Sequence, residues 1–189
     1  MSLYEIADLV LKTLVLFGGV FALWRWVVEQ RWRRYERLDE FIESFEKDEM
    51  IGFATQVLDW SRRTVVMSGG QAVKFSSSDV AAALRIHTEA DSQVTFPDPQ
   101  DKIRDAFDAI LAFFGRLESA IANGFIDEDA TLDYFGYWLE RMNTMSEHKS
   151  ADSNVENKMR RYEDKYGPGR TTMDRLYERM ATRIKVWAG

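Results

Sequence analysis

The chain has 189 residues and a net charge of −6, and 46% of its residues are hydrophobic and 13% aromatic. This composition supports a packed core, excludes a wholly disordered chain and argues against a general nucleic-acid binder. The absence of cysteine excludes disulfides, thiolate metal sites and a cysteine nucleophile. Two histidines, His87 and His148, leave few candidates for metal binding or acid–base chemistry.

The longest apolar segment covers residues 9–28 and is interrupted by Lys12 and Arg25. As a helix it is ~30 Å long, the thickness of a bilayer core, although the uncharged part between the two charges reaches only ~18 Å. Both charges lie near the ends of the segment, where long side chains extend to the lipid headgroups. The segment therefore predicts a membrane anchor over residues 1–30, followed by a helical domain over residues 31–189.

Charged and aromatic residues flank this segment unequally. Glu5 and Asp8 precede it, whereas its C-terminal end carries residues suited to lipid headgroups: Trp24, Trp26, Arg31, Arg33 and Arg34. Trp32 and Arg37 continue this series. By the positive-inside rule the N-terminus lies outside and the rest of the chain is cytoplasmic. We therefore expect a single-pass membrane protein with a cytoplasmic C-terminal domain.

Two other readings of the segment remain open. A cleaved signal peptide requires basic residues before the apolar run, and here they follow it. An amphipathic surface helix or a helix buried in a soluble core also fits the hydrophobicity. Gly18 and Gly19 permit close helix contacts and self-association, but glycines are also common in membrane helices without that role.

Hydrophobic periodicity predicts that the first helix continues past residue 30 and breaks at Asp48 and Glu49. A second helix follows up to Trp60. Two short strands then surround a Ser-Gly-Gly turn at residues 68–70, and the serines at 76–78 are N-cap candidates for another helix.

The second half of the chain predicts three further helices. Asp98 is expected to cap the first, with Pro99 at its first helical position, and Asn123-Gly124 ends it. The next begins at the acidic residues 127–129. The polar residues 146–158 predict a loop. After the Gly-Pro-Gly break at 167–169, Thr171 or Thr172 caps the last helix. The expected fold is mainly α: an N-terminal transmembrane helix and a cytoplasmic helical domain with a small β-ribbon.

The motifs for common chemistries are incomplete. The acidic residues 127–133 lack the spacing, central glycine and final glutamate of an EF-hand, so a helix N-terminus with solvated carboxylates explains them better. The turn at 68–71 lacks the lysine of a P-loop. Arg170 stands beside a helix start, where an anion can dock, but a plain interhelix turn explains it better. His87 fits a helix C-terminus. We expect no cofactor, no metal site and no enzymatic activity.

Arg141 and His148 are separated by six residues, in "RMNTMSEH". This spacing resembles the R-x4–6-H pattern of HEPN ribonucleases, in which dimerisation brings the two residues together on RNA. An arginine can stabilise phosphate charge and a histidine can transfer a proton. Met142 departs from the polar residue that usually follows the arginine. The two residues are weak catalytic candidates, and the alternative is that they have no joint role.

The segments "VLDWSRRTVV", "AAALRIHTEA" and "IRDAFDAILAFFGRLESAIANGFIDEDATLDYFGYWLERM", with the N-terminal anchor, resemble small uncharacterised bacterial membrane-anchored helical proteins. More distantly, the layout and the Arg141/His148 spacing are similar to the HEPN-like membrane effector that accompanies type VI-B CRISPR nucleases. These resemblances imply the bacterial inner membrane as the location, and the second implies a homo-oligomeric, pore-forming membrane effector in antiphage defence. Lys12 and Arg25 would then face a lumen.

Two alternatives to the pore stay open: a membrane-tethered binding or scaffold module without a pore, and a HEPN-type ribonuclease. The expected partners are membrane lipid, further copies of the chain, and a protein or nucleic-acid trigger. No small-molecule substrate is evident from the sequence.

Overall fold

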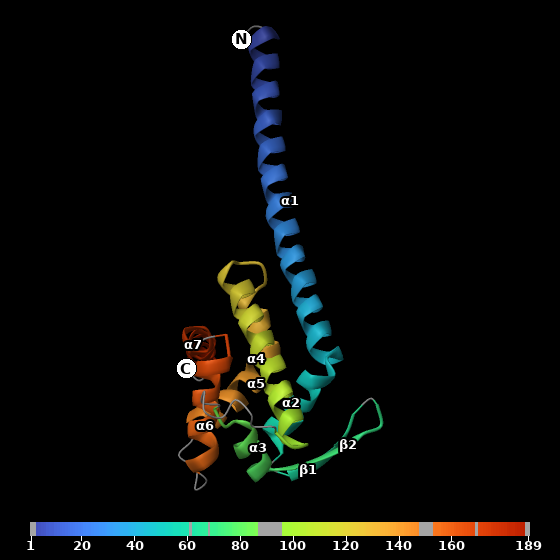
Figure 1. Ribbon diagram of the computed structural model, residues 1–189. Coiled ribbons are helices and arrows are strands. Elements are labelled where there is room, and N and C mark those ends of the chain that lie inside the picture. The colour runs from blue at the N-terminus through green and yellow to red at the C-terminus, as the bar shows by residue number, and fades with distance from the viewer. Residues whose placement is uncertain are drawn as a thin grey trace.

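The computed structural model describes residues 3–60, 62–67, 69–86, 96–147, 153–168 and 170–187. Helices dominate it, and one two-stranded sheet accompanies them (Figure 1), so the predicted fold class is confirmed. In chain order the elements are α1 (Leu3–Lys47), α2 (Glu49–Asp59), β1 (Arg62–Val66), β2 (Ala72–Ser76), α3 (Ser77–Ala83), α4 (Gln100–Ala122), α5 (Glu128–Glu147), α6 (Ser153–Tyr166) and α7 (Arg170–Trp187).

Helix α1 is one unbroken helix of 45 residues, which is ~68 Å long. Its N-terminal part projects from the body and its C-terminal part packs against it (Figure 1). Leu38 and Phe45 are buried in that packed part. The helix ends where Asp48 caps α2 by accepting hydrogen bonds from the backbone N–H groups of Met50 and Ile51. The predicted continuation of the first helix and its break are both confirmed.

The core of the body is built around α4, which packs against α2, α3 and α7. The apolar residues of α4, which recur with helical spacing, are fully or nearly fully buried: Ile103, Phe107, Ile110, Leu111, Phe114, Leu117 and Ile121. Three aromatic rings from α1, α4 and α5 meet at the centre of the core. The ring of Phe45 lies 5.1 Å from those of Phe113 and Phe135, which are 5.3 Å apart. This aromatic cluster fixes the packed end of α1 to α4 and α5.

The two predicted strands form an antiparallel hairpin, with Val65 opposite Val73. Val65, Val73 and Phe75 are buried against the helices, which a two-stranded ribbon needs for stability. The turn closes with a bond from Met67 N–H to the Gln71 carbonyl at 2.9 Å, and Gly70 has a φ of 75°. A left-handed glycine at this point is typical of a three-residue hairpin loop.

The predicted cap of α4 is wrong by one residue. Helix α4 begins at Gln100, and Pro99 occupies the cap position without a side-chain hydrogen bond. Asp98 is engaged elsewhere, because its Oδ2 accepts a hydrogen bond from Gln71 Nε2 at 3.3 Å and lies 3.8 Å from Lys102 Nζ. A contact with the distant hairpin thus replaces the local cap.

Two predictions near the C-terminus also need correction. Residues 153–158, which were expected in a loop, form the first turns of α6. Helix α6 is mostly polar, and Met159 and Tyr162 are among the few apolar side chains that it buries, so the sequence offers few apolar residues that would mark a helix there. The break before the last helix is confirmed, but α7 already begins at Arg170, so Thr171 and Thr172 lie within its first turn instead of capping it.

Candidate functional site

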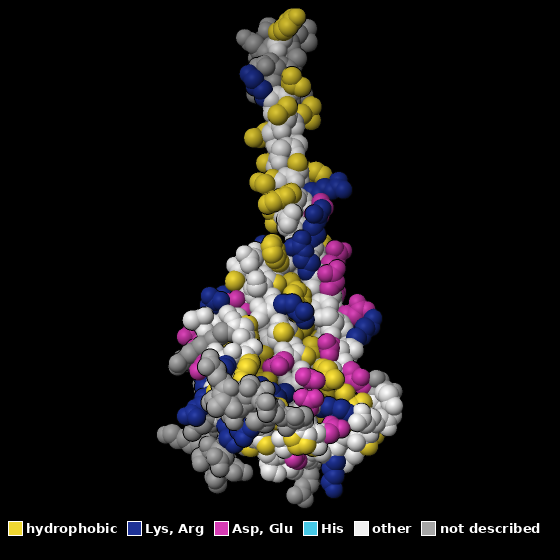
Figure 2. Space-filling view, in the orientation of Figure 1, with side chains coloured by type: hydrophobic (Ala, Val, Ile, Leu, Met, Phe, Trp, Pro, Cys, Tyr) yellow, Lys and Arg dark blue, Asp and Glu magenta, His cyan; other side chains and the backbone are white. Residues whose placement is uncertain are grey.

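The projecting part of α1 is long and apolar enough to cross a membrane, and none of its apolar window is buried inside the molecule. Figure 2 shows hydrophobic side chains along this projection and basic side chains where it approaches the body. Four consecutive residues share nearly the same exposure: Leu14 63%, Val15 68%, Leu16 67% and Phe17 67%. Because consecutive helical residues point ~100° apart, the helix is apolar on all sides at this level.

The two charges in this segment lie on different sides of the helix. Lys12 and Arg25 are thirteen residues apart, which places them ~140° apart around the axis and ~20 Å apart along it. Gly18 and Gly19 lie between them, and a Cβ built on either glycine meets nothing within 4 Å. The predicted membrane residues are therefore all on one projecting element, but the two charges do not share a face.

The predicted headgroup residues continue along the same exposed helix. Trp24 and Trp26 are 61% and 57% exposed, and Arg31, Arg33 and Arg34 are exposed as well. Arg33 forms an ion pair of 2.6 Å with Glu29. Arg37 marks the approach to the body, because its guanidinium lies 5.3 Å from the ring of Phe125 in the α4–α5 loop.

Arg141 has a structural role in the body. Its NH2 group donates to the Leu58 carbonyl at 2.8 Å, and its Nε lies 3.3 Å from Asp59 Oδ1. Tyr137 donates to the same carboxylate at 2.6 Å, so α5 holds the C-terminal end of α2. His148, the expected partner of Arg141, lies outside the described residues, as does His87.

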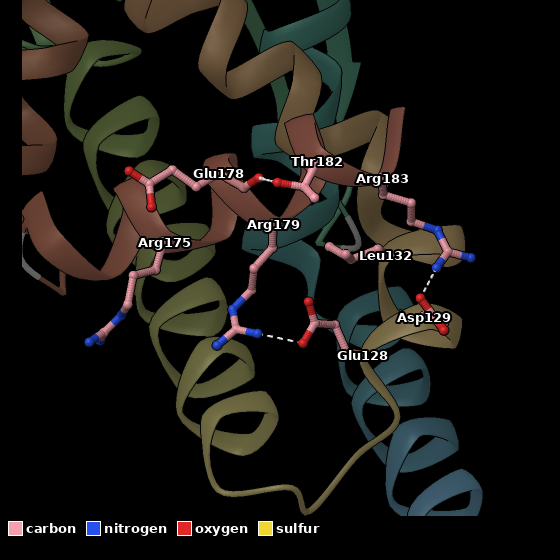
Figure 3. Close-up of a pocket in the computed structure, with 8 residues that line it drawn as sticks. All are labelled: Glu128, Asp129, Leu132, Arg175, Glu178, Arg179, Thr182 and Arg183. Carbon is pink, nitrogen blue, oxygen red and sulfur yellow. Dashed lines mark hydrogen bonds and ion pairs between the residues drawn. The ribbon is translucent and has the colours of Figure 1, made fainter. Parts of the chain in front are cut away.

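A cleft of about 730 Å³ between α5 and α7 was not predicted from the sequence (Figure 3). Its lining residues are Glu128, Asp129, Leu132, Arg175, Glu178, Arg179, Thr182 and Arg183. Three arginines spaced four residues apart on α7 face carboxylates of α4 and α5. Arg179 pairs with Glu128, and Arg183 pairs with Asp129.

The deepest of these pairs involves Glu118 on α4, which is 2% exposed and lies 2.8 Å from Arg175 Nε. Arg183 also pairs with Asp133 at 2.6 Å. Each of these three arginines is thus compensated by a carboxylate, which fastens α7 to the body. The acidic residues 127–133 do start a helix, as predicted, but several contact α7 arginines instead of solvent alone.

A second polar cluster surrounds Arg104, which is 9% exposed. Its NH1 group donates to the carbonyls of Ala83 and Arg85, both at 2.8 Å. Three rings flank the guanidinium at 4.7 to 4.9 Å: those of Phe96, Tyr162 and Tyr166. This arginine therefore joins the end of α3 to α6.

Burial and carboxylate partners raise the pKa values of two tyrosines in the body. Burial, together with the hydrogen bond to Asp108, raises the pKa of Tyr162 far above its usual value. The hydrogen bond to Glu46 raises the pKa of Tyr134 to about 12. Within the described ranges, no group of three or more His, Cys, Asp or Glu residues is placed to hold a metal ion. These polar contacts join helices of the body.

One family model matches the chain over residues 12–148, and its description reads "Domain of unknown function (DUF4760)". The match covers more than two thirds of the 189 residues. It begins within the projecting part of α1 and ends just after α5, so α6 and α7 lie beyond it. No curated protein and no solved structure matches the chain.

Proposed function

The chain belongs to the DUF4760 family, and we propose that it is a single-pass membrane protein whose helical body is tethered to the cytoplasmic face as a binding module. The observation that carries this proposal is the unburied apolar surface of α1, which surrounds the helix at residues 14–17. Soluble proteins rarely expose apolar surface of this extent, whereas lipid covers it on every side.

The charges support the orientation. Lys12 and Arg25 lie near opposite ends of the apolar segment, so each side chain can reach the nearer headgroup layer. Arg31, Arg33 and Arg34 follow on exposed helix, where each basic side chain near anionic lipid contributes about 1 kcal/mol to binding. Because basic residues flanking a span gather on its cytoplasmic side, the proposal places the N-terminus outside. It places lipid headgroups around Trp24 and Trp26.

Fractionation and labelling test this proposal. The protein should remain with membranes after carbonate extraction, because a spanning helix is not released by high pH. The chain has no cysteine, so single cysteines report its orientation. A membrane-impermeant maleimide should label Tyr4→Cys in intact cells and Phe125→Cys only after permeabilisation. Release by carbonate would contradict the anchor, and the reverse labelling pattern would contradict the orientation.

A second candidate is a homo-oligomeric, pore-forming effector in bacterial antiphage defence. The observation in its favour is that none of the apolar window of α1 is buried inside the molecule and that Gly18 and Gly19 have open space around them, so copies of the helix can associate. In a straight helix the ~140° between Lys12 and Arg25 allows only one of them to face a lumen.

Planar-bilayer recordings separate the two candidates. A pore predicts conductance from the purified protein, and neutralising the lumen-facing charge, by Lys12→Gln or Arg25→Gln, should change anion selectivity while the other substitution does not. A tether predicts no conductance from any of the three proteins. The contacts of Arg141 with Leu58 and Asp59 favour a structural role for this residue over a role in RNA cleavage.

A further inference from the structure

The hairpin of β1 and β2 has an open edge. In an antiparallel pair, residues that exchange ladder hydrogen bonds alternate with residues whose backbone groups point outward. The bond from Met67 N–H to the Gln71 carbonyl fixes this alternation. Val65 and Val73 therefore exchange ladder bonds, whereas Thr64 and Lys74, which are also directly opposite, direct their N–H and C=O groups away from each other.

The outer edge of β2 is partly closed. The outward N–H of Ser76 donates to Asp79 Oδ2 at 2.9 Å, which agrees with the alternation. Lys74 stands at the centre of this edge and is exposed, and an edge lysine opposes pairing with another strand.

The outer edge of β1 is not closed in this way. Its outward residues are Arg62, Thr64 and Val66, and no described group outside the strand forms a hydrogen bond with their backbone. Val66 is 68% exposed and Trp60, just before the strand, is 53% exposed. Unpaired backbone groups beside exposed apolar side chains are a template for strand addition.

We propose that β1 pairs antiparallel with β1 of a second copy of the chain, centred on Thr64. In this register Thr64 faces its own counterpart and Arg62 faces Val66, so all three outward residues on each strand find outward partners. No two arginines stand opposite each other, and a Thr–Thr pair is favourable across strands. A shift by one residue would place outward groups opposite inward ones and would lose these hydrogen bonds.

The anchor makes such a small interface effective, and in this respect the inference rests on the proposed membrane location. Confinement to one bilayer raises the effective concentration of the copies, so five paired residues can suffice. Two copies in one bilayer are related by an axis along the anchors. The two-fold axis between paired antiparallel strands is perpendicular to their sheet. The strands must therefore cross the direction of α1, as β1 and β2 do in Figure 1. The pairing would also give the expected homo-oligomer a defined interface.

Single cysteines test the register directly, because the native chain has none. In the proposed dimer the two Thr64 Cα atoms lie ~5.5 Å apart, within reach of a disulfide. Membranes carrying Thr64→Cys, treated with an oxidant such as copper phenanthroline, should shift the band from 22.0 kDa to twice that mass. Lys74→Cys is the matched control and should stay monomeric. Equal cross-linking of the two variants would overturn the proposal.

Proline substitutions provide an independent measurement, made by energy transfer between donor-labelled and acceptor-labelled copies in one bilayer. Thr64→Pro removes an outward N–H without breaking the hairpin ladder, so it should convert dimer to monomer and abolish the energy transfer. Lys74→Pro removes the corresponding N–H on β2 and should leave the dimer intact. A Thr64→Pro protein that stays dimeric would refute the pairing. Carbonate extraction of the same membranes tests the anchor separately. A protein that stays in the membrane but forms no cross-links contradicts the strand pairing and leaves the anchor intact.

Discussion

Gly115 on α4 packs directly against Pro168 in the turn between α6 and α7. A Cβ built on Gly115 would lie 2.5 Å from Pro168 Cβ and 3.0 Å from its Cγ. The proline ring is rigid, and it stands between two helices that are both packed on the body, so it cannot rotate away as a flexible side chain would. Gly115→Ala should therefore push α4 and this turn apart.

Two opposing effects set the magnitude. Replacing glycine by alanine within a helix stabilises it by about 1 kcal/mol. Overpacking a close contact costs about 1–3 kcal/mol. Gly136→Ala, within α5, is the matched control, because its Cβ would meet nothing within 4 Å and only the favourable effect remains. The control should thus be more stable than the native protein, and Gly115→Ala should be less stable than the control by about 1–3 kcal/mol.

Thermal unfolding of the full chain in detergent measures the difference. For a protein of this size 1 kcal/mol corresponds to about 2–4 °C, so Gly115→Ala should melt at least ~2 °C below Gly136→Ala. Pro168→Gly removes the opposing atoms, and Gly115→Ala should cost less in that background than in the native one. Equal melting temperatures for Gly115→Ala and Gly136→Ala would refute the steric reasoning.

Three further predictions concern polar contacts between helices. Glu46 raises the pKa of Tyr134 to about 12, above the usual value of 10. The contact therefore stabilises the fold below pH 10, and this stabilisation is lost as the pH rises through 12. The urea midpoint of the native protein should fall over this pH range, and Tyr134→Phe should flatten the fall. Arg175→Ala should lower the free energy of unfolding by about 1–3 kcal/mol, which is more than Glu118→Gln should. Losing the exposed arginine weakens the compensation of a buried carboxylate, whereas losing the carboxylate charge leaves an arginine that water can solvate. Urea unfolding that ranks the two variants in the opposite order would contradict this. Arg141→Ala should lower the melting temperature, whereas a purely catalytic residue would leave it unchanged.

Local patterns predicted most of the elements. The apolar residues of α4 recur with helical spacing, and they are buried because one face of that helix fills the core. The Ser-Gly-Gly sequence predicted the hairpin, since a left-handed residue at Gly70 favours glycine. The apolar N-terminal segment predicted a helix that is long enough to cross a membrane, and the projecting part of α1 matches it.

The features that were missed depend on residues far apart in the chain. Arg183 and Asp129 are 54 positions apart, and no local rule pairs them. The spacing of the α7 arginines was a usable signal for a basic stripe on that helix, but the carboxylates it faces follow only from the packing. Asp98 is similar, because its contact with Gln71 spans 27 positions and replaces the local cap.

The unbroken course of α1 has a mechanical consequence. With residues 9–28 in a bilayer, Phe45 lies ~26 Å further along the same rigid helix, at the centre of the aromatic cluster. A 20° tilt of the span, an average value for membrane helices, displaces Phe45 sideways by ~9 Å. Because the tilt of a membrane helix responds to bilayer thickness, a change in the lipids would move the whole body relative to the membrane surface. A flexible linker between span and body would absorb the tilt and leave the body in place.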